Sequence, residues 1–172
     1  MNDVFISLGT NIEPKEERLA QARELLRAEE PLNWRESKIY ETKPWGEPKQ
    51  AKFLNQAVGF QSEKTPHELL RLCKEIEQKL GRQKREKWKE REIDLDILYC
   101  GLCIEKDETL TIPHPYIAQR EFVLKPLCDI APDFIDPQSG KSVREMYKTI
   151  QITQTPNSYT PSTVSYTSPT TP

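Results

Sequence analysis

Two aspartates separated by a single residue stand near the middle of the chain, in the run Arg91-Glu92-Ile93-Asp94-Leu95-Asp96-Ile97-Leu98. Alternate side chains of a strand point to the same face, so both carboxylates would lie on one face and the aliphatic residues on the other. Such a pair can hold hard divalent ions and leave coordination positions for phosphate oxygens. Acidic residues on the wet face of a strand are also common without any metal, so both interpretations stand at this point.

A basic segment directly precedes the aspartates. Six cationic residues fall within ten positions around Trp88: Arg82, Lys84, Arg85, Lys87, Lys89 and Arg91. Charge at this density cannot be buried, which predicts an exposed loop. Solvated basic loops are common, but one that adjoins two carboxylates favours chemistry on phosphates and magnesium.

Length and charge limit the possible classes. The chain has 172 residues and a formal net charge of -2, with a pI near 5.8, which predicts one main domain and argues against general affinity for nucleic acid. No window approaches eighteen apolar residues, and Val4 to Leu8 reads as a strand rather than a signal peptide. We therefore expect a cytoplasmic protein that does not bind membranes.

The four cysteines give a weak signal. Only Cys100 and Cys103 have the spacing of a redox or zinc pair, and no second pair or histidine cluster in the sequence completes four zinc ligands. Cys73 and Cys128 fall in apolar patterns. The sequence thus predicts four reduced structural thiols.

The elements that must position the aspartates follow from periodicity and turn signals. Strands are expected at 4–8, 34–40, 54–60 and around Asp94, with helices at 15–28 and from the capping box at Thr65 to Gly81, a hairpin through Gly101, an extended piece at 110–112 and a last helix from Ser142. This order predicts an α+β fold, a ferredoxin-like antiparallel sheet with helices packed on one face. The loop 41–50 contains two prolines and a glycine, and long loops of this kind often cover ligands.

The composition changes near residue 151. From there Ser, Thr, Pro and Gln dominate, with no charged residue and almost no large aliphatic side chain. Such a segment cannot bury enough apolar area to offset the cost of ordering the chain. We expect a domain at residues 1–150 and a disordered tail at 151–172.

Seven ordered motifs resemble one enzyme family, the 6-hydroxymethyl-7,8-dihydropterin pyrophosphokinases, which move a pyrophosphoryl group from ATP to a pterin alcohol in folate biosynthesis. The resemblance covers roughly residues 3 to 148. The motifs are Leu8-Gly9-Thr10-Asn11, Tyr40-Glu41-Thr42-Lys43-Pro44-Trp45-Gly46, Phe53-Leu54-Asn55, Gly81-Arg82, Arg91-Glu92-Ile93-Asp94-Leu95-Asp96, Pro113-His114-Pro115 and Arg120-Glu121-Phe122-Val123-Leu124.

The resemblance implies which residues handle ATP. Asp94 and Asp96 would hold two magnesium ions against the triphosphate, and Arg82 and Arg91 would contact the phosphates as further catalytic groups. The chain has no Walker loop, so side chains and metal must hold the phosphates. The implied nucleotide-binding set is Glu77, Arg82, Lys84, Arg85, Arg91, Thr111, His114, Tyr116 and Arg120.

The resemblance also implies a pterin site. Phe53 and Phe122 would sandwich the flat ring, and Thr42 and Asn55 would hydrogen-bond to it. Without the resemblance, both phenylalanines would be read as core residues. The implied pterin-binding set is Thr42, Lys43, Pro44, Trp45, Phe53, Asn55, Trp88 and Phe122, with Trp45 and Trp88 in loops that close over the substrates.

The expected partners are therefore ATP and 6-hydroxymethyl-7,8-dihydropterin, bound by a monomer without nucleic acid or membrane. Two other classes remain open at this stage. A ferredoxin-like domain can bind single-stranded RNA on its sheet, although that requires exposed aromatic residues and a basic face. A catalytically silent interaction module with a modified Ser/Thr-rich tail would show no magnesium-dependent nucleotide binding.

Overall fold

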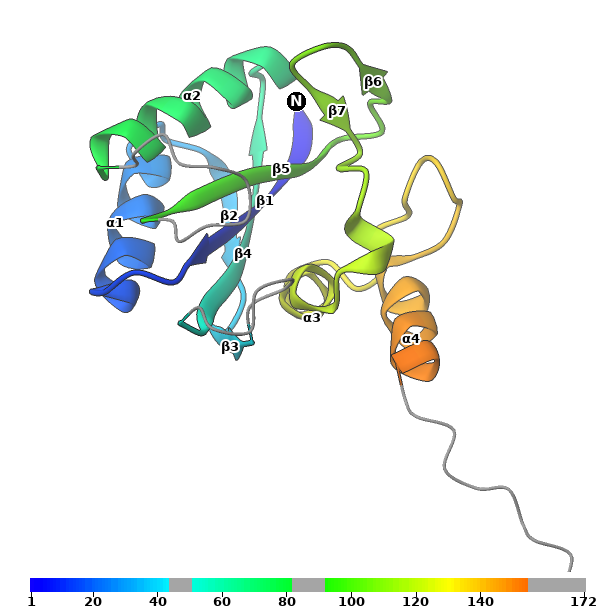
Figure 1. The fold of residues 1–172 in the computed structure, drawn as a ribbon. Coiled ribbons are helices and arrows are strands. Elements are labelled where there is room, and N and C mark those ends of the chain that lie inside the picture. The colour runs from blue at the N-terminus through cyan, green and yellow to red at the C-terminus, as the bar shows by residue number, and fades with distance from the viewer. Residues whose placement is uncertain (44–50, 82–91, 155–172) are drawn as a thin grey trace, which may run out of the picture.

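The computed structural model describes residues 1–43, 51–81 and 92–154. Figure 1 shows a central sheet with helices on both sides. The elements are β1 (Asn2–Thr10), α1 (Lys15–Arg27), β2 (Leu32–Glu36), β3 (Tyr40–Thr42), β4 (Phe53–Ser62), α2 (Pro66–Lys79), β5 (Asp94–Cys100), β6 (Glu105–Lys106), β7 (Thr111–Ile112), a 3-10 turn (Ile117–Gln119), α3 (Glu121–Ile130) and α4 (Val143–Gln154).

The main sheet is antiparallel, with strand order β2-β4-β1-β5 and β3 paired to β4. This order confirms the expected α+β architecture. The single strand expected at 34–40 is wrong in detail, because the chain makes two short strands there. Arg35 pairs with Gly59 in β2, and Tyr40 pairs with Asn55 in β3, so both pieces line the same edge of β4.

Helices cover both faces of the sheet, which corrects the expectation of one covered face. On one face α1 and α2 pack over side chains that include Val4, Ile6 and Leu8. On the other, α3 and α4 pack over Phe5 and Tyr99 (Figure 1). Strands buried on both faces need apolar residues at successive positions, as β1 has.

Helix α3 was not expected from the sequence. Its ten residues include Pro126, and a proline inside a helical pattern usually argues against a helix. Val123, Leu124 and Leu127 are buried, so packing against the sheet supplies the stability that local propensity does not. The helix α3 matters for the site because it begins one residue before Phe122.

The local signals for the other helices are confirmed. Thr65 and Glu68 form the expected capping box at the start of α2, and Gly81 after its end has a φ of +84°. Ser142 accepts a hydrogen bond from the Glu145 N–H at 3.2 Å just before α4. The helix α4 runs to Gln154, beyond the expected start of the tail at residue 151, and residues 155–172 lie outside the described structure.

All four cysteines are free thiols. Within the described ranges, no helix combines the length and apolarity needed to span a membrane.

Candidate active site

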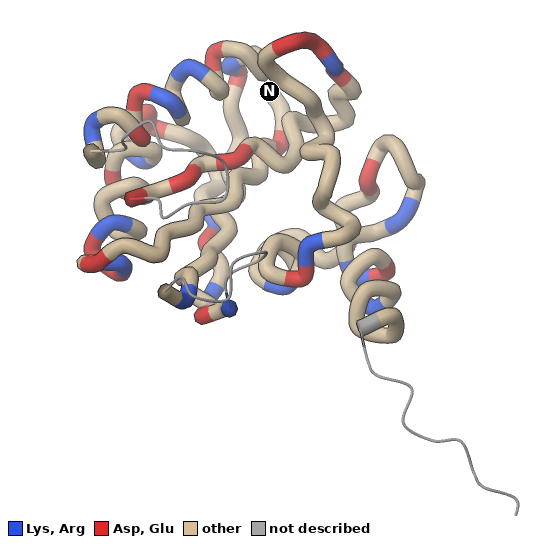
Figure 2. Tube along the Cα trace, in the orientation of Figure 1, with Lys and Arg blue, Asp and Glu red and all other residues tan. Residues whose placement is uncertain are grey.

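Asp94 and Asp96 lie on β5, and both are half-buried. The residues between and beside them, Ile93, Leu95 and Ile97, belong to the core under α1 and α2. The alternation of the strand therefore turns both carboxylates to the other face of the sheet, the side of α3. Figure 2 shows acidic residues recurring along β5.

The register of the sheet places Asp94 in a row with Asn55. Gly9 on β1 pairs with Asn55 on one side and with Asp94 on the other. Two strand spacings separate these residues, which is about 10 Å. A Cβ on Gly9 would lie 3.4 Å from the Asn55 Oδ1 atom. Glycine at this position therefore leaves space between the Asn55 amide and the Asp94 carboxylate.

Glu77 supports the aspartate pair from α2. Its side chain is 2% exposed, and Oε1 accepts a hydrogen bond from the Leu95 N–H at 2.9 Å. Among the described residues, β5 is the last strand in the order, so the Leu95 N–H that bonds to Glu77 has no strand of the sheet to pair with on that side. The other oxygen, Oε2, lies 3.0 Å from Lys74 Nζ. Glu77 thus fixes the peptide between the two aspartates.

The carboxylates of Asp94, Asp96 and Glu77 lie close together, and their proximity affects the pKa of Asp96. Burial, followed by the charges of Asp94 and Glu77, raises the pKa of Asp96 to about 6, although the charges of Lys74 and Arg120 act in the opposite direction. A cluster with this excess of negative charge is suited to a divalent cation, which favours the ionised carboxylates.

Thr10 anchors the chain just before β5. Its fully buried hydroxyl donates to the Glu92 carbonyl at 2.7 Å, which ties the end of β1 to the segment that leads into Asp94. The motif Leu8-Gly9-Thr10-Asn11 marks Thr10 in the sequence but does not predict this contact, because the partner lies 82 residues away.

Three of the candidate pterin residues, Thr42, Phe53 and Asn55, lie on β3 and β4. Asn55 is 4% exposed, and its Nδ2 donates to Thr42 Oγ1 at 2.6 Å. Phe53 pairs with Thr42 across the two strands and lies two residues from Asn55, so their side chains share a face. Lys43 follows β3 and is exposed. Phe122 is half-buried in α3, which packs against β4.

A second group surrounds Arg120 between β7 and α3. The Arg120 guanidinium carbon lies 5.1 Å from the Tyr116 ring centre and 5.7 Å from that of Phe122. His114 donates its backbone N–H to the Leu98 carbonyl of β5 at 3.1 Å. Burial, and then the charge of Arg120, lower the pKa of His114 to about 4, whereas the charge of Asp94 acts in the opposite direction. His114 is therefore a neutral imidazole at pH 7.

Residues 5–132 match the family model of 7,8-dihydro-6-hydroxymethylpterin-pyrophosphokinase. This chain belongs to that family.

Relatives of similar length agree with this assignment. The 2-amino-4-hydroxy-6-hydroxymethyldihydropteridine pyrophosphokinase of Methylorubrum extorquens is 42% identical over 146 residues, covering 84% of this chain and 91% of that protein. The protein of the same name from Aquifex aeolicus is 36% identical over 146 residues, covering 84% of this chain and 90% of its own length.

Solved structures show the same fold. The chain superposes on wild-type HPPK-DHPS of Plasmodium falciparum with pteroate at a TM-score of 0.67 and 16% identity. The match covers 86% of this chain but only 42% of that one, so this chain spans less than half of the solved protein.

The structure therefore brings Asp94, Asp96 and Glu77 together. A second group joins Thr42 to Asn55, and a third joins Tyr116 and Phe122 to Arg120. Thr111 lies in β7, which pairs with β6 and leads directly to His114. Several residues that the resemblance to the pyrophosphokinase family implied lie outside the described residues: Pro44, Trp45, Arg82, Lys84, Arg85, Trp88 and Arg91. Their roles remain predictions from sequence.

Proposed function

We infer that this chain transfers the pyrophosphoryl group of ATP to the hydroxymethyl oxygen of 6-hydroxymethyl-7,8-dihydropterin, the reaction that its family and its relatives' names denote. In this reaction the alcohol oxygen attacks the β-phosphorus of ATP. The bond from that phosphorus to the bridging oxygen of the α-phosphate breaks, AMP leaves, and the alcohol proton is lost. The chain is thus an ATP-dependent transferase of folate biosynthesis.

The assignment of the site depends on one observation: Asn55, Gly9 and Asp94 lie side by side on three neighbouring strands. A pterin held at Asn55 would direct its hydroxymethyl group along the open glycine toward the carboxylates. The amide of Asn55 and the hydroxyl of Thr42 can pair with the donor and acceptor edge of the ring, and Phe53 and Phe122 can stack on its faces.

Asp94 and Asp96 would hold magnesium, two ions in this proposal, and the raised pKa of Asp96 supports a site built for positive charge. When bound, magnesium neutralises the charge of the phosphate oxygens in transfer. Glu77 holds the peptide between the two ligands in place. Arg120, with Tyr116, provides a planar cation and an aromatic face suited to the nucleotide. His114 is neutral and can accept or donate a hydrogen bond there.

We further propose that the chain acts as a monomer in the cytoplasm, where ATP is plentiful. Binding of RNA is not favoured, because the chain has a formal net charge of -2 and β5 carries two carboxylates, those of Asp94 and Asp96.

The test is nucleotide release from ATP and magnesium, with and without the pterin, for the wild-type chain and for Asp94→Asn and Asp96→Asn. We expect AMP only when the pterin is present, and a loss of kcat of at least about 100-fold in each variant, since charge stabilisation at the transition state is removed. The matched control is Asp133→Asn, whose exposed carboxylate pairs with Arg144 far along the chain and should leave kcat unchanged.

Three results would contradict the proposal. Formation of ADP would mean attack on the γ-phosphorus. Release of AMP without pterin would mean hydrolysis. Full activity of Asp94→Asn and Asp96→Asn would leave pyrophosphoryl transfer standing but would refute the assignment of the metal ligands.

A further inference from the structure

A set of hydrogen bonds outside the candidate substrate residues joins β3 to the last turn of α3. The Tyr40 hydroxyl donates to the Asp129 carboxylate, 2.9 Å from Oδ2 and 3.1 Å from Oδ1. The Lys38 backbone N–H donates to the same Oδ2 atom at 3.1 Å. Burial, and then the hydrogen bond to Asp129, raise the pKa of Tyr40, so its hydroxyl keeps the proton that it donates. Asp129 thus holds two groups that lie 89 and 91 residues earlier in the chain.

The chain needs such an acceptor between β2 and β3. The ladder advances four residues from Glu36 to Tyr40, but only three residues along β4. One residue is therefore extra, and an extra residue of this kind leaves backbone groups without a partner in the ladder. The Lys38 N–H lies in this segment, and Asp129 accepts its hydrogen bond. Asp129 therefore fixes the chain where it enters β3.

The side of α3 that bears Asp129 also bears Phe122. Phe122, Lys125 and Asp129 stand at positions i, i+3 and i+7, which lie on one side of a helix. The Lys125 Nζ atom lies 4.7 Å from the centre of the Tyr40 ring, so this side of α3 faces β3. Phe122 and Asp129 are seven residues apart on the helix, which is about 10 Å.

The side of β3 that bears Tyr40 also bears Thr42. The two residues alternate on the strand, so their side chains point the same way. Both lie beside Asn55: Tyr40 pairs with it across the ladder, and Thr42 Oγ1 accepts a hydrogen bond from its Nδ2 atom at 2.6 Å. The residue that contacts α3 and the residue implied in pterin binding therefore share one face of a strand of three residues.

Strand β3 and helix α3 run in opposite directions past each other (Figure 1). Lys38 contacts Asp129, and Tyr40, two residues later, contacts both Asp129 and Lys125, which lies one turn nearer the start of the helix. The next residue on this side of β3 is Thr42, which continues toward the first turn of α3. That turn carries Phe122, the residue implied to stack on the pterin.

We propose that Asp129 and Tyr40 are positioning residues for the pterin, because they fix the distance between Thr42 on β3 and Phe122 on α3. This inference rests on the proposed function, since it concerns the site that holds the ring. A flat ring can stack on an aromatic side chain and keep its hydrogen bonds only if the two elements stand at the right separation. Neither positioning residue needs to touch a substrate.

The element that these bonds restrain is β3 rather than α3. Helix α3 is anchored to the sheet by Val123, Leu124 and Leu127, which are buried. Strand β3 has three residues and gains an anchor at the side chain of Tyr40. Loss of the bonds to Asp129 should therefore release β3 and weaken pterin binding, while the aspartate pair on β5 and the group around Arg120 stay in place.

The test is steady-state kinetics of the full chain with magnesium, ATP and the pterin, for Asp129→Ala, Tyr40→Phe and the double variant. We expect the KM for the pterin to rise about 3- to 10-fold in each single variant, a modest effect because Asp129 is exposed. The KM for ATP and kcat should stay within about twofold, since only binding of the pterin is altered. The double variant should match Asp129→Ala, because the two changes remove the same bond.

Two further variants separate positioning from stability. Tyr99→Phe removes the same kind of bond elsewhere, because the Tyr99 hydroxyl donates to Asp136 at 2.8 Å in the core under α3 and α4. It should lower the Tm more than Asp129→Ala does and leave the KM for the pterin unchanged. Asp129→Asn should restore that KM to within about twofold of the wild-type value, because an amide can accept from Lys38 and donate to Tyr40.

An unchanged KM for the pterin in Asp129→Ala and Tyr40→Phe would overturn the inference and leave the proposed function standing. The inference would also fail if kcat fell alone, or if Tyr99→Phe raised the KM as much, since loss of stability would then explain the effect. A wild-type chain that releases no AMP in the presence of the pterin would refute the proposed function, and the positioning role with it.

Discussion

Removal of the Glu77 carboxylate should destabilise the fold, whereas its replacement by an amide should not. In Glu77→Ala the buried Leu95 N–H loses the acceptor that lies 2.9 Å away. An unsatisfied buried donor costs about 1–3 kcal/mol, and the lost methylene adds about 0.8 kcal/mol. Relief of the repulsion between Glu77 and Asp96 offsets part of this, so we expect a net loss of about 2 kcal/mol in the free energy of unfolding.

Glu77→Gln separates the hydrogen bond from the charge. The amide oxygen can still accept from Leu95, and the lost ion pair with Lys74 is worth little because that lysine side chain is 52% exposed. We expect a change within about 0.5 kcal/mol. Glu75→Ala, at an exposed position on the same helix, is the control for the substitution itself and should be equally mild.

Urea denaturation at pH 7.5, followed by circular dichroism, measures all three variants, and the Tm of Glu77→Ala should fall by about 4–8 °C. If Glu77→Ala and Glu77→Gln unfold at the same urea concentration, the hydrogen bond to Leu95 does not support β5 and the reasoning fails.

Three further predictions concern the site and the core. Asn55→Ala should raise the KM for the pterin by about 10-fold or more in steady-state kinetics, because a hydrogen-bonding group of the substrate would be left unpaired, and an unchanged KM would refute that role. Gly59→Ala should lower the stability to urea by about 1–3 kcal/mol, since its Cβ would lie 2.9 Å from the buried Phe5 ring, and a neutral effect would show that the ring can move. Because the pKa of His114 is lowered to about 4, mainly by burial, the unfolded chain takes up this proton first, so the contribution of His114 to stability should be constant above about pH 6.5 and fall as the pH drops from there toward 4. Between about pH 6.5 and 4, His114→Gln should lose less of its free energy of unfolding than the wild-type chain does, by about 1 kcal/mol in total after allowance for solvent screening, and an equal loss in both would contradict the shift.

Several features of this protein were readable from the sequence because they depend on neighbours a few residues apart. The spacing of Asp94 and Asp96 determines that they share a strand face, whatever the rest of the fold does. The capping box at Thr65 and the glycine after α2 mark the ends of that helix by local hydrogen bonding and backbone freedom. The order of such elements sufficed to predict an antiparallel α+β sheet.

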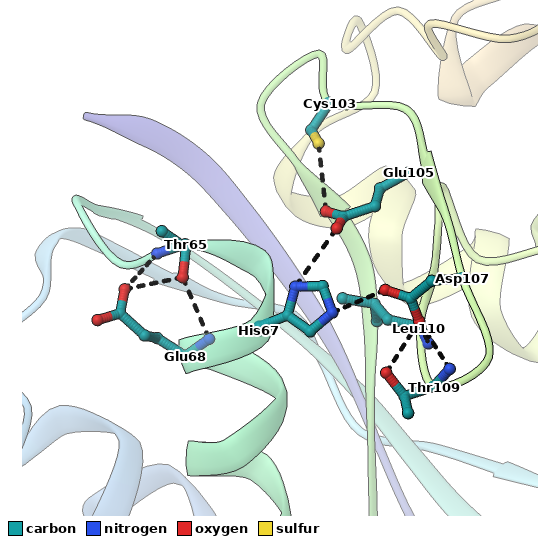
Figure 3. A network of polar contacts seen from close by, with 8 residues as sticks. All are labelled: Thr65, His67, Glu68, Cys103, Glu105, Asp107, Thr109 and Leu110. Atoms are coloured by element: carbon teal, nitrogen blue, oxygen red, sulfur yellow. Dashed lines mark hydrogen bonds and ion pairs between the residues drawn. The ribbon is translucent and has the colours of Figure 1, made fainter.

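The tertiary structure alone decided which of these residues meet. The register of β1 with β4 and β5 puts Asn55 and Asp94 in one row through Gly9, and a shift by one residue would turn them to opposite faces. Helix α3 forms in spite of Pro126 because the sheet offers it an apolar surface. His67 and Asp107 lie 40 residues apart in the sequence and meet only when α2 packs beside the β6–β7 hairpin (Figure 3). Periodicity and capping act over one or two turns, whereas these contacts depend on how distant segments pack, which no local pattern specifies.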